Sequence, residues 1–265
     1  MATSATVSAA LPSQARYLAW RSVLRTIRQP IMIVPALVFP LFLLAVNSSG
    51  LDAATQIPGF PTDSYLTFAL AFPFLQGAIF ATNTAGTNLA DDIGSGFFNR
   101  LSLTPMGGSA LLAGQLAGVM VVASIQMVAY LAVGLAAGAS FEAGVGGIPV
   151  LFALSLATAA AFGALGLFVG LRSGSGEAVQ GLFPLMFVLL FLSSAAMPRD
   201  LIAHDWFQTA ATINPVSYLI EGIRSLFITG WDGEALALAF AIAVAIFVAA
   251  LGAAGYAMRD RMVRT

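Results

Sequence analysis

The sequence predicts an all-α membrane protein with six transmembrane helices, an N-terminal interfacial amphipathic helix and an extracellular re-entrant helical hairpin between helices 5 and 6. Of the 265 residues 59% are apolar and only 9% are charged. A soluble domain of this size carries about 25% charged residues, because its surface must face water. The charged residues also cluster, which leaves several apolar stretches of about 20 residues, enough to cross a bilayer as helix. One such stretch fits a soluble core, whereas a series of them indicates a membrane bundle.

The arginines orient these spans. Four precede the first span, three follow the last, and Arg100 and Arg172 fall in the second and fourth loops. With six spans these nine lie on one side, and only Arg199 and Arg224 lie on the other. The positive-inside rule then predicts a multi-pass plasma-membrane protein with both termini in the cytoplasm. Prolines inside the spans are tolerated when neighbouring helices satisfy the freed carbonyls. The expected spans are 31–46, 65–85, 111–138, 148–171, 179–196 and 235–258.

The segment before the first span predicts an amphipathic helix at the membrane surface. At helical spacing one apolar stripe forms beside a second stripe of arginines, a pattern that suits the headgroup region. The alternative is an arginine-rich flank with no special function. We expect two parts, a cytoplasmic tail with the interfacial helix at 1–30 and the transmembrane domain at 31–265. The stripes are Tyr17, Trp20, Leu24 and Ile27 on one side and Arg21, Arg25 and Arg28 on the other.

The second loop, 88–105, is expected in the cytoplasm yet carries several apolar residues. Exposed apolar residues on a short loop indicate docking to a partner. The alternative is that the loop tucks under its own helix bundle. The residues concerned are Ile93, Phe97, Phe98, Leu101 and Leu103.

The last extracellular segment, 198–233, is too apolar for a plain linker. Asn214-Pro215 signals a turn or a helix start, and apolar residues recur at helical spacing from Val216. The stretch is too short to span, which predicts a helix that dips into the outer leaflet. Glu221 and Arg224 are three residues apart and are candidates for an ion pair that latches an extracellular gate, with a solvated surface pair as the alternative.

Few polar residues lie within the spans. No Asp, Glu, Arg or His occurs at mid-depth, which argues against coupling to protons or sodium and favours an apolar or amphipathic substrate. Five polar residues are candidates for the substrate pathway, although bonds that hold the helices together are the favoured alternative for each. The G-x-x-x-G pairs, such as Gly166 and Gly170, indicate close helix packing. The five candidates are Gln76, Asn83, Gln115, Gln126 and Tyr130.

The residue inventory excludes several classes of site. The chain has no cysteine and a single histidine, so thiolate sites and multi-histidine metal clusters are excluded. All basic residues are arginine, whereas a phosphate-binding loop needs its lysine. We therefore expect no catalytic, cofactor or metal site in this chain, and ATP, if used, to be bound by another. The net charge of −1 gives no indication of nucleic acid.

Three stretches carry a resemblance to a known family. They read LRTIRQP at 24–30, FNRLSLTP at 98–105 and INPVSYLIEGIR at 213–224. The order, length and topology of the chain together with these motifs resemble the ABC-2 family of transporter permeases, most closely the drug permeases of the daunorubicin-resistance type. In two places the pattern departs: no basic residue follows Thr104-Pro105, and Asp91-Asp92 stands where glutamate is commoner.

The resemblance implies a permease subunit that exports an apolar or amphipathic drug or lipid-like substrate. It implies a second permease subunit, surrounding lipid, and a separate ATPase dimer that binds ATP and Mg. Asn214, Pro215, Glu221 and Arg224 would form the extracellular gate. The alternatives are a polysaccharide or glycolipid exporter permease and an ATP-independent carrier. The implied ATPase coupling residues are Tyr17, Trp20, Arg21, Arg25, Arg28, Asp91, Asp92, Phe97, Phe98, Arg100, Leu101, Thr104 and Pro105.

Overall fold

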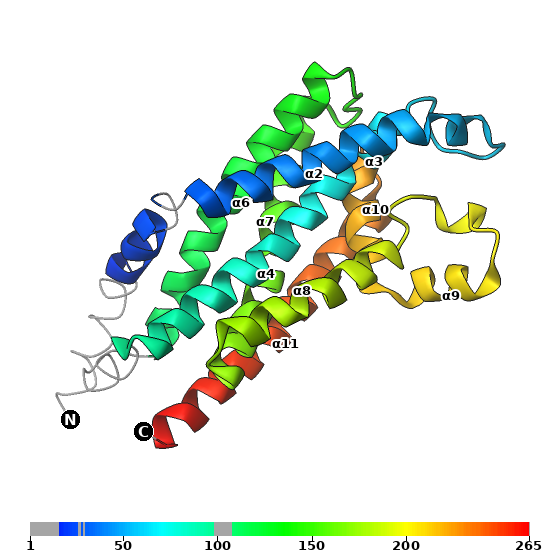
Figure 1. Cartoon of the computed structure of the whole chain (residues 1–265). Coiled ribbons are helices and arrows are strands. Elements are labelled where there is room, and N and C mark those ends of the chain that lie inside the picture. The colour runs from blue at the N-terminus through cyan, green and yellow to red at the C-terminus, as the bar shows by residue number, and fades with distance from the viewer. Residues whose placement is uncertain (1–15, 26–27, 29, 98–107, 265) are drawn as a thin grey trace.

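A computed structural model of the chain describes residues 16–25, 28, 30–97 and 108–264 (Figure 1). Within these ranges the secondary structure is entirely helical. Residues 16–25 form a helix ahead of α2. The elements that follow are α2 (Pro30–Gly50), η1 (Asp52–Gln56), α3 (Tyr65–Ala69), α4 (Ala71–Gly94), α6 (Gly108–Ala136), α7 (Gly144–Ser173), α8 (Gly176–Phe191), η2 (Arg199–Leu201), α9 (Asp205–Ile213), α10 (Pro215–Ile228) and α11 (Gly233–Arg264).

Each predicted span coincides with an apolar helix of the structure. In the described residues four helices are long and apolar enough to cross a membrane, and they run over Tyr65–Gly94, Gly108–Ala136, Gly144–Ser173 and Gly233–Arg261. The other two apolar helices, Val34–Gly50 and Gly176–Phe191, are shorter. The all-helical fold is therefore confirmed, and the count of six spans, the re-entrant hairpin and the interfacial helix stay predictions.

The central helix of the bundle is α4. In the apolar window of Tyr65–Gly94, which comprises α3 and α4, 89% of the residues are buried inside the protein. In Figure 1 α4 runs between α2 and α8 with α6 and α7 beside it. Its tightest contact is with α7, where small residues let the two backbones meet: a Cβ on Gly170 would lie 2.6 Å from the carbonyl oxygen of Gly86. The Thr82 hydroxyl adds a hydrogen bond of 2.9 Å to the carbonyl oxygen of Phe162. The G-x-x-x-G pair on α7 thus forms the helix contact that its spacing predicts.

The structure corrects the predicted start of the second loop, because α4 is longer than expected. The sequence places a loop from residue 88 onward, but α4 continues as helix to Gly94. Leu89 and Asp92 are buried there, so packing against the bundle stabilises these turns. The rest of the predicted loop, 98–105, lies outside the described residues.

Contacts identify the two ends of the bundle. At one end Leu18 of the helix 16–25 lies against Gly114 of α6, and Arg172 of α7 pairs with Asp260 of α11 at 3.8 Å. The short elements η1, η2 and α9 lie at the opposite end (Figure 1). We name these the arginine-rich end and the hairpin end.

Candidate functional sites at the two ends of the bundle

A cluster of charged side chains joins the helix 16–25 to the end of α4. Arg21 donates to the Asp92 carboxylate at 2.9 and 3.3 Å, and Arg25 donates to it at 3.2 Å. Arg25 also reaches Asp91 at 2.9 Å. From α6, the Gln115 amide donates to Asp92 at 2.8 Å. We name these five residues the arginine–aspartate cluster.

Helix geometry explains the cluster. Arg21 and Arg25 are four residues apart and so share one face of their helix, while the extension of α4 to Gly94 places Asp91 and Asp92 opposite them. The residue Asp92 is only 2% exposed. A buried carboxylate is costly unless it is paired and hydrogen-bonded, and two guanidinium groups and an amide meet that need here. The Arg21 guanidinium also stacks 4.0 Å above the Phe97 ring.

The remaining coupling candidates divide into exposed residues and residues without a described position. Tyr17 and Trp20 are 78% and 62% exposed, so these two side chains face outward while Arg21 and Arg25 contact α4. Arg28 is exposed as well. Phe98, Arg100, Leu101, Thr104 and Pro105 lie outside the described residues.

The structure separates the five pathway candidates. Gln126 and Tyr130 both donate to the carbonyl oxygen of Ala36 on α2, which lies four residues before Pro40 and so lacks an amide partner within the helix. With Gln115 bonded to Asp92, three of the five fit the alternative in which polar side chains hold helices together.

Gln76 and Asn83 differ from these three. Gln76 is completely buried, and neither its amide nitrogen nor its oxygen has a hydrogen-bond partner in the described protein; the side-chain oxygen of Asn83 also lacks one. Both lie on α4, seven residues apart and therefore on one face of the helix. Unsatisfied buried amides are uncommon and call for an explanation.

A row of aromatic rings lies beside Gln76. Phe72 and Phe80, one helical turn to either side of it, contact Phe191 at 6.1 Å and Phe183 at 5.2 Å between ring centroids. The row continues through α8 and reaches α2, and its outer members Phe39 and Phe191 are 41% and 56% exposed. Its members are Phe39, Phe72, Phe80, Phe183, Phe187 and Phe191. We name this set the aromatic row.

At the hairpin end, Asn214 joins α10 to α8. Its side-chain oxygen accepts a hydrogen bond from the Val216 amide and so caps α10, and Pro215 is the first residue of that helix. The Asn214 amide donates to the carbonyl oxygens of Leu189 and Leu192 at 2.6 and 3.1 Å, at the end of α8. The predicted helix start at Asn-Pro is confirmed, and the link to α8 adds a function that the local motif does not show.

The structure does not contain the candidate ion pair between Glu221 and Arg224, and each side chain has other partners. Glu221 binds Arg199 of η2 at 2.6 Å. Arg224 is 6% exposed, donates to the carbonyl oxygens of Phe68 and Ala195 at 3.0 and 2.9 Å, and lies 3.6 Å above the Phe68 ring. The three-residue spacing permits the Glu221–Arg224 pair but does not decide it, because η2 folds back over α10 and brings Arg199 closer.

The Arg224 guanidinium stays charged in this setting. Burial lowers the pKa of Arg224 to about 9, while the nearby Glu221 carboxylate opposes the shift. The pKa therefore remains above neutral pH. Helix α10, which carries the group, lies outside the four long apolar helices.

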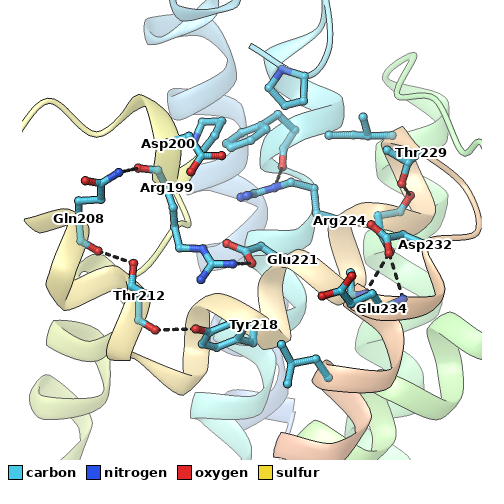
Figure 2. Close-up of a pocket in the computed structure, with 17 residues that line it drawn as sticks. Arg199, Asp200, Gln208, Thr212, Tyr218, Glu221, Arg224, Thr229, Asp232 and Glu234 are labelled. Atoms are coloured by element: carbon cyan, nitrogen blue, oxygen red, sulfur yellow. Dashed lines mark hydrogen bonds and ion pairs between the residues drawn. The ribbon is translucent and has the colours of Figure 1, made fainter. Parts of the chain in front are cut away.

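Both arginines lie at a pocket of about 700 Å³ at the hairpin end. Figure 2 shows Arg199, Glu221 and Tyr218 along one wall and Arg224, Asp232 and Glu234 along the other. Its volume falls within the range of small-molecule sites. Sequence reasoning missed Arg199 and Tyr218 as site residues. The sequence signal for Arg199 was its predicted place on the side of the membrane opposite to the nine clustered arginines.

The comparisons with known proteins agree with this architecture. The model of the ABC-2 type transporter family matches residues 13–228. The daunorubicin resistance ABC transporter permease protein DrrB1 of Streptomyces coeruleorubidus is 27% identical over 213 residues, which cover 78% of this chain and 72% of that protein. The family resemblance predicted from the three motifs is thereby confirmed. With its bundle of apolar helices and a family match over most of its length, the chain belongs to the ABC-2 type transporter family and is similar to a drug-resistance permease.

Proposed function

We propose that this chain is the membrane-spanning permease subunit of an ABC-2 exporter, driven by ATP that a separate ATPase dimer binds with Mg and hydrolyses. It carries no nucleotide site of its own and catalyses no reaction. The substrate class is an apolar or amphipathic compound, drug-like or lipid-like. A second permease chain, identical or homologous, completes the transporter in the plasma membrane.

The arginine–aspartate cluster is the observation that supports this proposal most strongly. The segments 17–27 and 91–105 are the two places where family resemblance implies contact with the ATPase. In the structure Arg21 and Arg25 tie the first segment directly to Asp91 and Asp92, at the start of the second. A displacement of either segment is therefore transmitted to α4, the central helix of the bundle, through the buried carboxylate of Asp92.

The substrate pathway proposed here runs past Gln76 and Asn83 along the aromatic row. The row offers an apolar surface that is open at Phe39 and Phe191. The unpartnered amide of Gln76, one helical turn from Phe72 and from Phe80 on α4, gains a hydrogen bond when a polar group of the cargo arrives. Mixed apolar and amide surface suits an amphipathic cargo.

The proposed membrane placement has six spans, with α2 and α8 as the two shorter ones. The arginine-rich end and both termini lie in the cytoplasm. The exposed side chains of Tyr17 and Trp20 lie at the inner headgroup region. Helices α9 and α10 form the re-entrant hairpin, which closes the outer end of the pathway with Asn214, Pro215, Glu221 and Arg224.

Co-purification tests the proposal. The tagged chain is extracted from its native membranes in mild detergent, and bound proteins are identified by mass spectrometry. Leu101→Asp alters the implied ATPase contact, and Ile57→Asp, at an apolar position 41% exposed near the hairpin end, is the matched control. We expect a nucleotide-binding ATPase with the wild type and with Ile57→Asp, and its loss with Leu101→Asp.

Transport is then measured with the recovered ATPase in everted vesicles, with daunorubicin, the compound in the relative's name, as the first probe. ATP-dependent uptake that Leu101→Asp abolishes supports drug export. Uptake without ATP, or no ATPase after cross-linking, overturns the proposal in favour of an ATP-independent carrier. An ATPase partner with uptake of a glycolipid instead of daunorubicin assigns the chain to the polysaccharide or glycolipid exporters.

A further inference from the structure

Glu221 and Tyr218 both contact the guanidinium group of Arg199. The Arg199 guanidinium lies 2.6 Å from the Glu221 carboxylate and 4.5 Å from the centroid of the Tyr218 ring. A carboxylate next to an aromatic face binds organic cations through charge and through the ring quadrupole. The side chains of Arg199 and Glu221 are 26% and 23% exposed, so a ligand in the pocket reaches both.

The pocket beside this site has an excess of negative charge. Four carboxylates and two guanidinium groups line it. The Arg224 guanidinium donates to two carbonyl oxygens, and Arg199 is bound to Glu221. Asp200 and Glu234 have no ion-pair partner within the described part of the chain. An incoming cation therefore finds carboxylates that no arginine neutralises.

Apolar side chains supply the other half of the lining. Phe68, Ile228 and Leu238 face the same space as the carboxylates. Apolar walls with a few charged groups are typical of sites that bind an apolar body and fix its orientation through a polar group. The lining thus matches a ring system that carries a protonated amine.

We propose that this pocket binds an organic cation, a protonated amine on an apolar ring, and that its ammonium group replaces the Arg199 guanidinium on Glu221 and Tyr218. The inference rests on the proposed export function in one respect, since it names a substrate class for the outer end of the pathway. No covalent step is involved.

Displacement of Arg199 from Glu221 also removes a contact between η2 and α10. The carbonyl oxygen of Arg199 accepts a hydrogen bond of 3.2 Å from Gln208 of α9, as Figure 2 shows. The Arg199 side chain therefore links η2 to α10 through Glu221, while its backbone links η2 to α9.

The test measures binding to the purified full chain in phosphatidylcholine nanodiscs, without any ATPase. The probes are 1-naphthylmethylamine, which is protonated at neutral pH, and the neutral 1-naphthylmethanol of nearly the same shape. Equilibrium dialysis gives each Kd after subtraction of uptake by empty nanodiscs. We expect the amine to bind at least about tenfold more tightly than the alcohol, the effect of one charge-assisted hydrogen bond.

The two halves of the ion pair give opposite predictions. Glu221→Gln removes the acceptor and weakens amine binding about tenfold or more. Arg199→Gln removes the competitor and strengthens it. A purely structural ion pair instead predicts that both variants act alike. Asp200→Asn, at an exposed residue, changes charge with little structural effect and weakens amine binding by a smaller factor.

Equal affinity for amine and alcohol, or weaker amine binding by a folded Arg199→Gln chain, overturns the inference. Thermal unfolding and gel filtration establish whether each variant is folded. If Arg199→Gln does not fold, the amine affinity of Asp200→Asn tests the inference in its place. This assay needs no ATPase. Failure here leaves ATP-driven export intact, and failure to find an ATPase leaves the amine site intact.

Discussion

A Cβ atom on Gly166 of α7 would lie 2.0 Å from the carbonyl oxygen of Thr82 on α4. Real side-chain carbons do not approach a carbonyl oxygen so closely, and the obstacle is backbone, which cannot rotate away. Glycine at 166 is therefore a requirement of the α4–α7 contact.

Gly166→Ala is expected to lower the melting temperature in detergent, because the added methyl group separates α4 from α7. The cost is roughly 1–3 kcal/mol, as for overpacked cores. Gly252→Ala is the matched control, since Gly252 lies in α11 and a Cβ there meets nothing within 4 Å. Equal melting temperatures for the two variants would contradict the backbone contact.

Asp92→Asn is expected to loosen the helix 16–25 from the bundle. It removes the charge that pairs with Arg21 and Arg25, with an expected cost of about 1–3 kcal/mol. Hydrogen exchange of residues 16–25 should speed up. Asp91→Asn is the control, because the Asp91 side chain is 63% exposed and exposed pairs contribute about 1 kcal/mol or less. Unchanged exchange in Asp92→Asn would refute the anchoring role.

Asn214→Asp is expected to destabilise the hairpin end almost as much as Asn214→Ala. Aspartate caps a helix as well as asparagine, but it cannot donate to the carbonyl oxygens of Leu189 and Leu192. The Asp232 side chain only accepts hydrogen bonds, from the backbone amides of Glu234 and Ala235. Asp232→Asn should therefore leave the melting temperature unchanged. Thermal unfolding measures all three, and a stable Asn214→Asp variant would show that the link to α8 contributes nothing.

Arg224→Lys is expected to destabilise the chain despite the retained charge. The planar guanidinium reaches two carbonyl oxygens while it stacks on Phe68, and an ammonium group does not reproduce that geometry. Arg172→Lys is the comparison, since the Arg172 side chain is 66% exposed and its exchange should have little effect. A smaller loss of melting temperature in Arg224→Lys than in Arg172→Lys would contradict this assignment.

The span count is testable with single cysteines, because the chain has none of its own. With six spans, an impermeant maleimide should label Ala53→Cys and Ser140→Cys on intact cells and spare Ser173→Cys. If α2 and α8 did not cross, all three results would reverse, with the N-terminus still inside. All three positions are exposed at the ends of helices or in connections.

Sequence reasoning located helices more reliably than contacts. Apolar length is a property of one segment, so all six apolar helices and the helix start at Asn214 were predictable. The partner of Glu221 depends on how η2 folds back, and the partner of Gln115 depends on how far α4 extends past residue 88. Neither relation has a periodic signal, because both join residues that are distant in sequence.

The same limit applies to the site at the hairpin end. Residue spacing brought Glu221 and Arg224 to one helix face, yet tertiary packing directed Arg224 toward Phe68 and Ala195 and left Glu221 to Arg199. The helix 16–25, by contrast, was predictable, because arginines and apolar residues alternate with the helical period from Tyr17 to Arg25.

The central position of α4 has a consequence for biosynthesis. The apolar window of α3 and α4 together has a mean hydropathy of 1.4, against 2.1 for α6 and α7 and 2.7 for α11, although it is the most enclosed of the four. A helix of low hydropathy gains little from contact with lipid. Its retention in the bilayer therefore depends on α7, which leaves the ribosome dozens of residues later and brings the Thr82–Phe162 hydrogen bond and the glycine contacts with it.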